Sequence, residues 1–120
     1  MRFKEILRDL VSNVDGASGA IFLDCDGEAV DWYSWEDGDR LKLRAAYLAV
    51  LVQTCRSTAD RLGLGFISNL VVEYDGAQCL IEEIESGYFF LLEMSFSANL
   101  AQAQRFVGPA VESLRQEIAA

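Results

Sequence analysis

The stretch LKLRAAYLAVLVQTCRSTADRLGLG, residues 41–65, decides the fold class, because it predicts one long helix with two apolar faces. A surface helix usually has one apolar stripe and a polar back. One stripe here, spaced alternately by four and three residues, contains Leu41, Ala45, Leu48, Val52, Cys55, Ala59 and Leu62. At about 100° of turn per residue, a second apolar group falls on the opposite side: Leu43, Ala46, Tyr47, Val50 and Thr54. The first stripe fits packing on a sheet, and the second needs another cover.

The segments before this helix predict a first helix over residues 2–14 and two strands over 17–24 and 29–35. Asp26-Gly27 is a short hairpin signal between the two strands. Asp39 is expected to cap the long helix, which runs from about 40 to 62.

The segments after Gly63 predict three strands, over residues 66–74, 77–85 and 88–96, with Asp75-Gly76 and Ser86-Gly87 as turns. Ser97 or Asn99 is expected to cap a last helix. Gly108-Pro109 should kink or restart that helix, since proline lacks an N–H and clashes with the preceding turn.

The element order is therefore helix, two strands, helix, three strands, helix. Residues 88–92, YFFLL, are apolar at consecutive positions, which is typical of a central strand covered on both faces. We therefore predict one α/β (α+β) sandwich domain over residues 1–120: a five-stranded antiparallel sheet with helices on both faces.

Composition restricts the class of protein. The 120 residues are 52% hydrophobic and 24% charged with a single proline, as in a globular domain. A net charge of −9 disfavours binding to nucleic acid or to anionic membranes. The apolar runs are too short to span a bilayer, so no membrane insertion is expected. The charged start MRFKEILRDL lacks a signal-peptide core, so the expected location is the cytoplasm.

The sequence gives little support for a catalytic site or a metal site. The chain has no histidine, which excludes Ser-His-Asp and Cys-His pairs and zinc sites with imidazole ligands. Cys25, Cys55 and Cys79 are expected to be buried reduced thiols. Acid–base work could use two carboxylates among Glu82, Glu83, Glu85 and Glu93. Solvated strand edges explain these residues better, so we expect no enzyme, no metal and no cofactor.

The second predicted strand carries three large aromatic residues. Alternation places Trp32 on one face and Tyr33 and Trp35 on the other. We expect Trp32 to pack in the core or under a helix, whereas an exposed Tyr33 or Trp35 would suit an interface.

The second apolar face of the long helix predicts self-association. Small Ala46 would let another helix approach closely, and strand 66–74 has no proline or lysine to protect an edge. Two copies could then join strand to strand with their long helices side by side. The candidate interface residues are Leu43, Ala46, Tyr47, Val50, Thr54, Phe66, Leu70 and Val72. The alternative is that another part of this chain covers the patch.

The order and motifs together resemble the roadblock (dynein light-chain) family. The matching segments are NVDGASGAIFLDCDGEAV, LRAAYLAVLVQT, NLVVEYDGAQCLI and SANLAQAQRF. In the last of these, Ala98, Asn99, Leu100 and Arg105 stand near the family's Ala-Asn-Leu-Gly-x-Ala-Arg signature. Ala101 replaces the usual glycine, and Gln104 departs from the pattern.

This resemblance implies a profilin-like fold that dimerises through its third strand and second helix into a ten-stranded sheet. It also implies a non-catalytic homodimer that binds a Ras-like small GTPase, as bacterial gliding-motility members do, often stimulating GTP hydrolysis. That mechanism is thought to reshape the GTPase's switch regions. An arginine finger from Arg40, Arg44 or Arg56 is the alternative.

The sequence leaves two other functions open. One is a ligand-sensing module that holds an apolar molecule under Trp32 and Trp35. The other is a scaffold or motor light chain that binds no nucleotide-switch protein.

Overall fold

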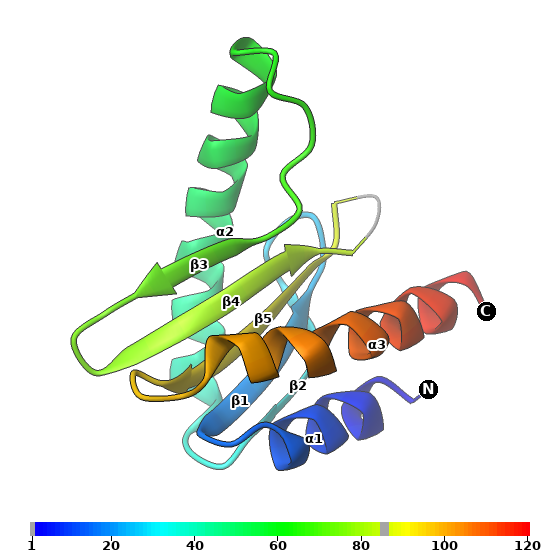
Figure 1. The fold of residues 1–120 in the computed structure, drawn as a ribbon. Coiled ribbons are helices and arrows are strands. Elements are labelled where there is room, and N and C mark those ends of the chain that lie inside the picture. The colour runs from blue at the N-terminus through cyan, green and yellow to red at the C-terminus, as the bar shows by residue number, and fades with distance from the viewer. Residues whose placement is uncertain (1, 85–86) are drawn as a thin grey trace.

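The computed structural model describes residues 2–84 and 87–120. Its elements, in chain order, are α1 (Phe3–Asn13), β1 (Ala17–Leu23), β2 (Ala29–Ser34), α2 (Gly38–Arg61), β3 (Leu70–Glu73), β4 (Ala77–Glu83), β5 (Phe89–Ser95) and α3 (Leu100–Ala119). The strands form one sheet in the order β2-β1-β5-β4-β3, antiparallel throughout. α1 and α3 cover one face, and α2 crosses the other (Figure 1). The predicted fold class and element order are confirmed.

β5 is the central strand, as its apolar run predicts. Its side chains alternate between two buried clusters. Phe90, Leu92 and Met94 pack with α1 and α3, whereas Phe89 and Leu91 pack with α2. The sheet therefore has a core on each face, and each helix layer depends on β5.

β3 is shorter than predicted, because residues 64–69 lie outside any strand. The register pairs Leu70 with Ile81, so Asn69 and Ser68 would face Glu82 and Glu83, and only residues before Ser68 would lie beyond the end of β4. The segment instead returns from the end of α2, which projects past the sheet (Figure 1). Phe66 is consequently in a connection and not in a strand.

α2 begins earlier than predicted. Its N-cap is Asp37, whose carboxylate accepts a hydrogen bond from the Asp39 N–H at 2.9 Å, so Asp39 is not the cap. Gly38 is buried beneath the Trp32 ring, and a Cβ on Gly38 would lie 2.3 Å from a ring carbon. The start of the helix is thus set by the Asp37 cap and by the close approach of Gly38 to Trp32, and local sequence signals could not reveal the second of these.

The sheet-facing stripe of α2 is confirmed for Leu41, Ala45, Val52 and Ala59, which are buried. The stripe fails at Leu62, which is 66% exposed because α2 has by then passed the edge of the sheet. Gly63, at φ 66°, ends the helix there, as predicted.

α3 runs unbroken through Pro109, so the predicted restart is wrong. The proline removes one helical donor, but the preceding Gly108 has no Cβ to clash with its ring. The predicted cap is confirmed at Asn99, whose side chain accepts from the Gln102 N–H at 3.0 Å.

An ion pair joins α2 to the sheet. Arg44 donates from Nε and Nη2 to the two carboxylate oxygens of Glu93 on β5, both at 2.7 Å. This hydrogen bonding raises the pKa of Arg44 above its usual value. Arg56 donates to Glu83 on β4 at 3.0 Å. Two predicted solvated carboxylates are therefore paired beneath α2, since one helix places two arginines over them.

The remaining carboxylates of that group behave differently. Glu82 is half-buried, and this burial raises its pKa. Glu85 lies outside the described residues. The three described carboxylates, at Glu82, Glu83 and Glu93, are therefore half-buried or paired and do not lie at solvated strand edges as predicted.

All three cysteines are free, but the predicted burial holds only for Cys79. Burial raises the pKa of the Cys79 thiol to about 11, and the negative charge of Glu93 adds to the shift. Cys25 is exposed at the turn after β1, and Cys55 is half-buried on the flank of α2. No helix among the described residues is long and apolar enough to cross a membrane.

Gly38→Ala tests the contact that sets the start of α2. The new methyl group would displace the Trp32 ring, and we expect a loss of about 1–3 kcal/mol in the free energy of unfolding. Urea unfolding followed by tryptophan fluorescence measures it. Gly76→Ala is the control, since no atom lies within 4 Å of its added Cβ. Equal stability of the two variants would contradict the contact.

Glu93→Ala tests the ion pair between α2 and β5. Removing the carboxylate leaves Arg44 unpaired at a site where its side chain is 37% exposed. We expect the free energy of unfolding to fall by about 1–3 kcal/mol, a range that already allows for screening by solvent at this exposure. The control is Glu112→Ala in an exposed pair on α3, with an expected change below about 0.5 kcal/mol. A loss at Glu93 no larger than at Glu112 would show that the pair does not hold α2.

Candidate interface on α2 and β3

The outer face of α2 is apolar and exposed. Leu43, Tyr47 and Val50 are 60%, 73% and 61% exposed, and Ala46 and Thr54 are exposed on the same side. The Thr54 hydroxyl donates to the Val50 carbonyl within the helix, so its hydrogen bond is satisfied locally. The described parts of the chain therefore leave this face uncovered, against the alternative that the chain covers it.

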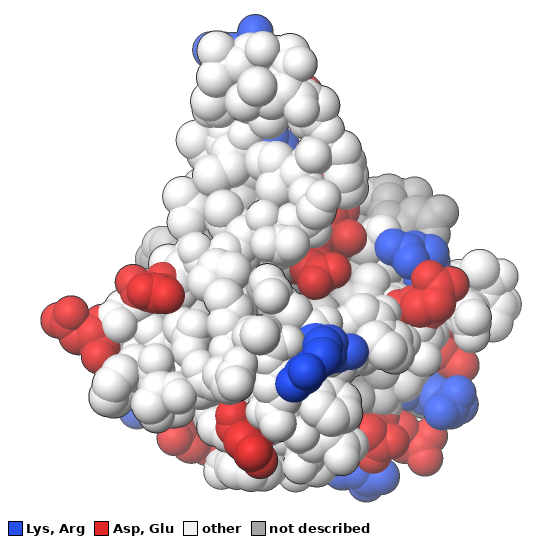
Figure 2. Space-filling model, in the orientation of Figure 1, with Lys and Arg blue, Asp and Glu red and all other residues white. Residues whose placement is uncertain are grey.

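The projecting end of α2 exposes further apolar side chains, beginning with Leu62 of the sheet-facing stripe. Leu62, Leu64 and Phe66 are all exposed on the projection and on the segment that returns from it. Figure 2 shows that this projection carries few charged side chains on the side in view. Exposed apolar side chains gathered on one part of a surface are typical of contact sites.

β3 lies at one edge of the sheet, as predicted for an interface strand. The Tyr74 N–H donates to the Ala77 carbonyl at 2.7 Å, which fixes the hydrogen-bonding phase of the β3–β4 pair. Val71 and Glu73 consequently turn their backbone N–H and C=O groups toward the open edge. Leu70 and Val72 pack against the α2-side core, so they support the edge from below.

The three arginines considered as fingers differ in availability. Arg44 and Arg56 are engaged by Glu93 and Glu83. Arg40 is exposed near the start of α2. Two of the three guanidinium groups thus hold α2 on the sheet, a structural role that a finger would have to abandon.

The motif Ala98-Asn99-Leu100 holds the connection between β5 and α3. The Gln78 amide donates to the Ala98 carbonyl at 2.9 Å. Gly16 packs so closely on Ala98 that an added Cβ would lie 2.9 Å from the Ala98 Cβ. The motif therefore acts in packing and capping. Buried Gln78 was missed in the sequence, because its three carbonyl acceptors lie more than 16 residues away.

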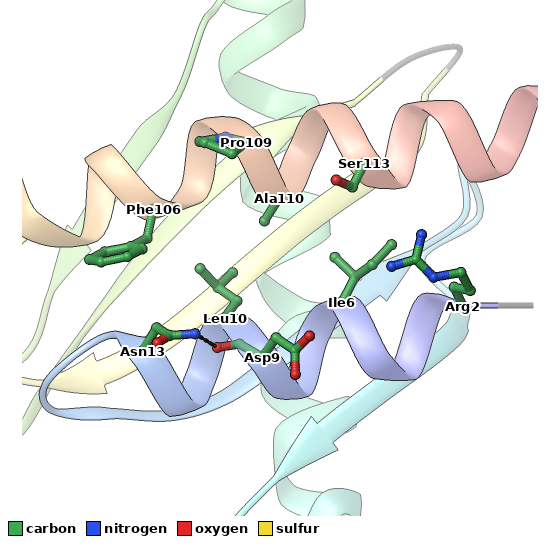
Figure 3. A pocket seen from close by; sticks show the side chains of 9 residues that line it. All are labelled: Arg2, Ile6, Asp9, Leu10, Asn13, Phe106, Pro109, Ala110 and Ser113. Atoms are coloured by element: carbon green, nitrogen blue, oxygen red, sulfur yellow. Dashed lines mark hydrogen bonds between the residues drawn. The ribbon is translucent and has the colours of Figure 1, made fainter.

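A groove with a volume of about 210 Å³ lies between α1 and α3. Ile6, Leu10 and Ala110 form its apolar floor, and Arg2 and Asp9 stand on its rim (Figure 3). A cavity of about 350 Å³ lies beside Arg44, Glu93 and Tyr74. Neither groove encloses a ligand-sized apolar volume.

The tryptophan site expected of a ligand sensor is occupied by protein. Gly38 lies against the Trp32 ring, and the ammonium groups of Lys4 and Lys42 lie 4.6 and 5.1 Å from its centroid. Tyr33 packs half-buried against the opposite core, and Trp35 is exposed. Among the described residues, no group of three potential ligands from His, Cys, Asp and Glu gathers to hold a metal ion.

No protein-family model matches this sequence, and no curated protein matches it. Solved structures do match its fold. A Roadblock/LC7 domain from Streptomyces avermitilis is 24% identical, with 98% of each chain covered and a TM-score of 0.89. MglB from Myxococcus xanthus is 13% identical, with 99% of this chain and 96% of that chain covered and a TM-score of 0.89.

The gliding protein MglB from Thermus thermophilus is 19% identical, with a TM-score of 0.84 over 96% of this chain and 87% of that one. Another similar structure is described as MglB with a tetrameric arrangement. At these identities the likeness concerns the fold, and it extends over nearly the whole chain. The chain has the fold of the Roadblock/LC7 domain.

Proposed function

We propose that this chain is a non-catalytic, homodimeric regulator of the roadblock type that binds a Ras-like small GTPase in the cytoplasm. The observation that carries the proposal is the uncovered apolar face of α2 beside the open edge of β3. Both features are self-complementary, since a strand edge can pair with a copy of itself and an apolar helix face can pack on its copy.

The proposed dimer forms in two layers. β3 pairs antiparallel with β3 of the second copy, and the two α2 helices pack side by side through Leu43, Ala46, Tyr47, Val50 and Thr54. Phe66, on the returning segment, adds apolar area, while Leu70 and Val72 hold β3 on its own core. The tetrameric arrangement described for one MglB concerns that protein, and it favours self-association as a use of this fold.

GTPase binding is the further step of the proposal, and it rests on the likeness to gliding proteins together with the earlier motif resemblance. The paired α2 helices would offer a broad apolar platform. Such a platform would raise GTP hydrolysis by favouring a competent arrangement of the GTPase's switch segments. Catalytic side chains from this chain are not needed, and Arg44 and Arg56 are already engaged in ion pairs.

The scaffold alternative shares the dimer and differs in its partner. A scaffold would bind its partner equally in the presence of GTP and GDP and would leave hydrolysis unchanged.

Tyr47→Asp and Val50→Asp test the dimer face. Each change places a charge at the centre of an apolar interface and opposite its own copy, so we expect the dimer dissociation constant to rise at least about tenfold. Light scattering after size exclusion should give twice 13.3 kDa for the wild type and 13.3 kDa for the variants when diluted.

Phe106→Asp is the matched control for those two variants. It places the same charge on an exposed aromatic residue of α3, on the opposite face of the sheet. Its mass should equal that of the wild type. Dimers that persist in both α2 variants, or that dissociate equally in the control, would remove the α2 face from the interface.

GTPase regulation is tested with the Ras-like small GTPases of the same genome, loaded with GTP or GDP. We expect GTP-selective binding and faster hydrolysis, both weakened by Val50→Asp. In the same assay the hydrolysis rate stimulated by Arg40→Ala should stay within about threefold of the rate stimulated by the wild type. Loss of an arginine finger would lower that rate by a factor of roughly 10³–10⁵. A collapse of the rate in Arg40→Ala would establish the finger. Binding to none of the GTPases would end the regulator proposal.

A further inference from the structure

The second edge of the sheet, at β2, differs from the edge at β3. The Trp35 N–H donates to the Ser18 carbonyl at 3.0 Å, which fixes the hydrogen-bonding phase of the β1–β2 pair. Tyr33 and Asp31 therefore turn their backbone groups toward β1, as Trp35 does. Trp32 and Ser34, which alternate with them, turn their backbone N–H and C=O groups outward. The outward groups of β2 are the ones that a further strand would need.

Both outward backbone groups of Trp32 are already bonded to side chains of this chain. The ammonium group of Lys4, on α1, donates to the Trp32 carbonyl. The Trp32 N–H donates to the carboxylate of Asp31 at 2.8 Å. Lys4 and Asp31 are themselves an ion pair with atoms 3.1 Å apart. We call these two residues the Lys4–Asp31 clamp.

The path of the Lys4 side chain explains how the clamp obstructs the edge. Lys4 belongs to α1, which covers the same face as α3 (Figure 1). Its ammonium group lies 4.6 Å from the centroid of the Trp32 ring, which packs against the α2-side core on the other face. The side chain therefore passes across the edge of β2. An incoming strand would have to displace it, which is how proteins protect sheet edges.

Apart from Asp31, β2 carries none of the residues that usually protect a sheet edge. Its sequence AVDWYS contains neither lysine nor proline. Val30 and Trp35 are exposed on either side of the clamp and would provide apolar contact to a paired strand. An antiparallel pair of β2 strands would place the same residues on both sides of the joint. The occupant that this edge fits is β2 of a second copy.

We propose that β2 is a second strand-pairing edge, kept closed by the Lys4–Asp31 clamp, so that copies of this chain join only through β3. The pairing at β3 rests on the proposed function, whereas the clamp at β2 stands independently of it. With one edge open and one closed, assembly through the sheet ends at two copies. Without the clamp, the same chain would have two open edges and could extend further.

The test is the double variant Lys4→Met/Asp31→Ala, which removes one positive and one negative charge and leaves the net charge at −9. Methionine keeps an unbranched apolar stem over Trp32. The matched control is Lys42→Met/Asp39→Ala. Lys42 also lies over the Trp32 ring, and it pairs with Asp39 at 3.7 Å. The control changes the same charges near the same ring and leaves the β2 backbone contacts intact.

We expect light scattering to show that the clamp variant has at least twice the mass of the wild type, and that this mass rises with concentration. The control variant should have the same mass as the wild type. Adding Ser34→Pro to the clamp variant should restore the wild-type mass, because it blocks the outward side of β2 without removing a bond to β1. If the double variant does not fold by circular dichroism, Lys4→Met alone is measured in its place.

Three results would overturn the proposal of a clamp. They are an unchanged mass in the folded clamp variant, an equal increase of mass in the control variant, and an increase of mass that persists when Ser34→Pro is added. Failure of the β3 dimer gives a different pattern, in which the wild type is a monomer and the clamp variant a dimer. That pattern supports the clamp and rejects the dimer in the proposed function.

Discussion

The structure depends on the burial of β5 on both faces. A strand with apolar side chains at consecutive positions must be covered above and below, so the helices divide between the two faces of the sheet. Two helices, α1 and α3, share one face, and α2 alone covers the other (Figure 1). With no neighbouring helix on its face, α2 keeps an exposed apolar outer side, which the proposed dimer would cover.

Ion pairs and close contacts hold α2 in this exposed position. Arg44 and Glu93 join its first half to β5, and Arg56 and Glu83 join its second half to β4. Gly38 seats its start under Trp32. These contacts let the helix extend past the sheet with its outer face free. The same two arginines are thereby engaged in holding α2 on the sheet.

The two edges of the sheet differ in whether their outward backbone groups are already bonded. β3 offers the outward groups of Val71 and Glu73, and the Lys4–Asp31 clamp occupies those of Trp32 on β2. An apolar helix face beside an open edge suits a two-fold contact, and a closed opposite edge limits growth.

The sequence by itself determined the element order and fold class, because periodicity, Asp-Gly turns and the run at residues 88–92 are local signals. It also revealed the second face of α2, since helical geometry alone separates Tyr47 from Val52. Tertiary structure alone decided the contact of Gly38 with Trp32, the short β3, the exposure of Leu62, and the pairing of Glu93 and Glu83. The clamp at β2 also needed it, since Lys4 and Trp32 are 28 residues apart. Each of these depends on which distant residue lies opposite, and a local pattern carries no information about that.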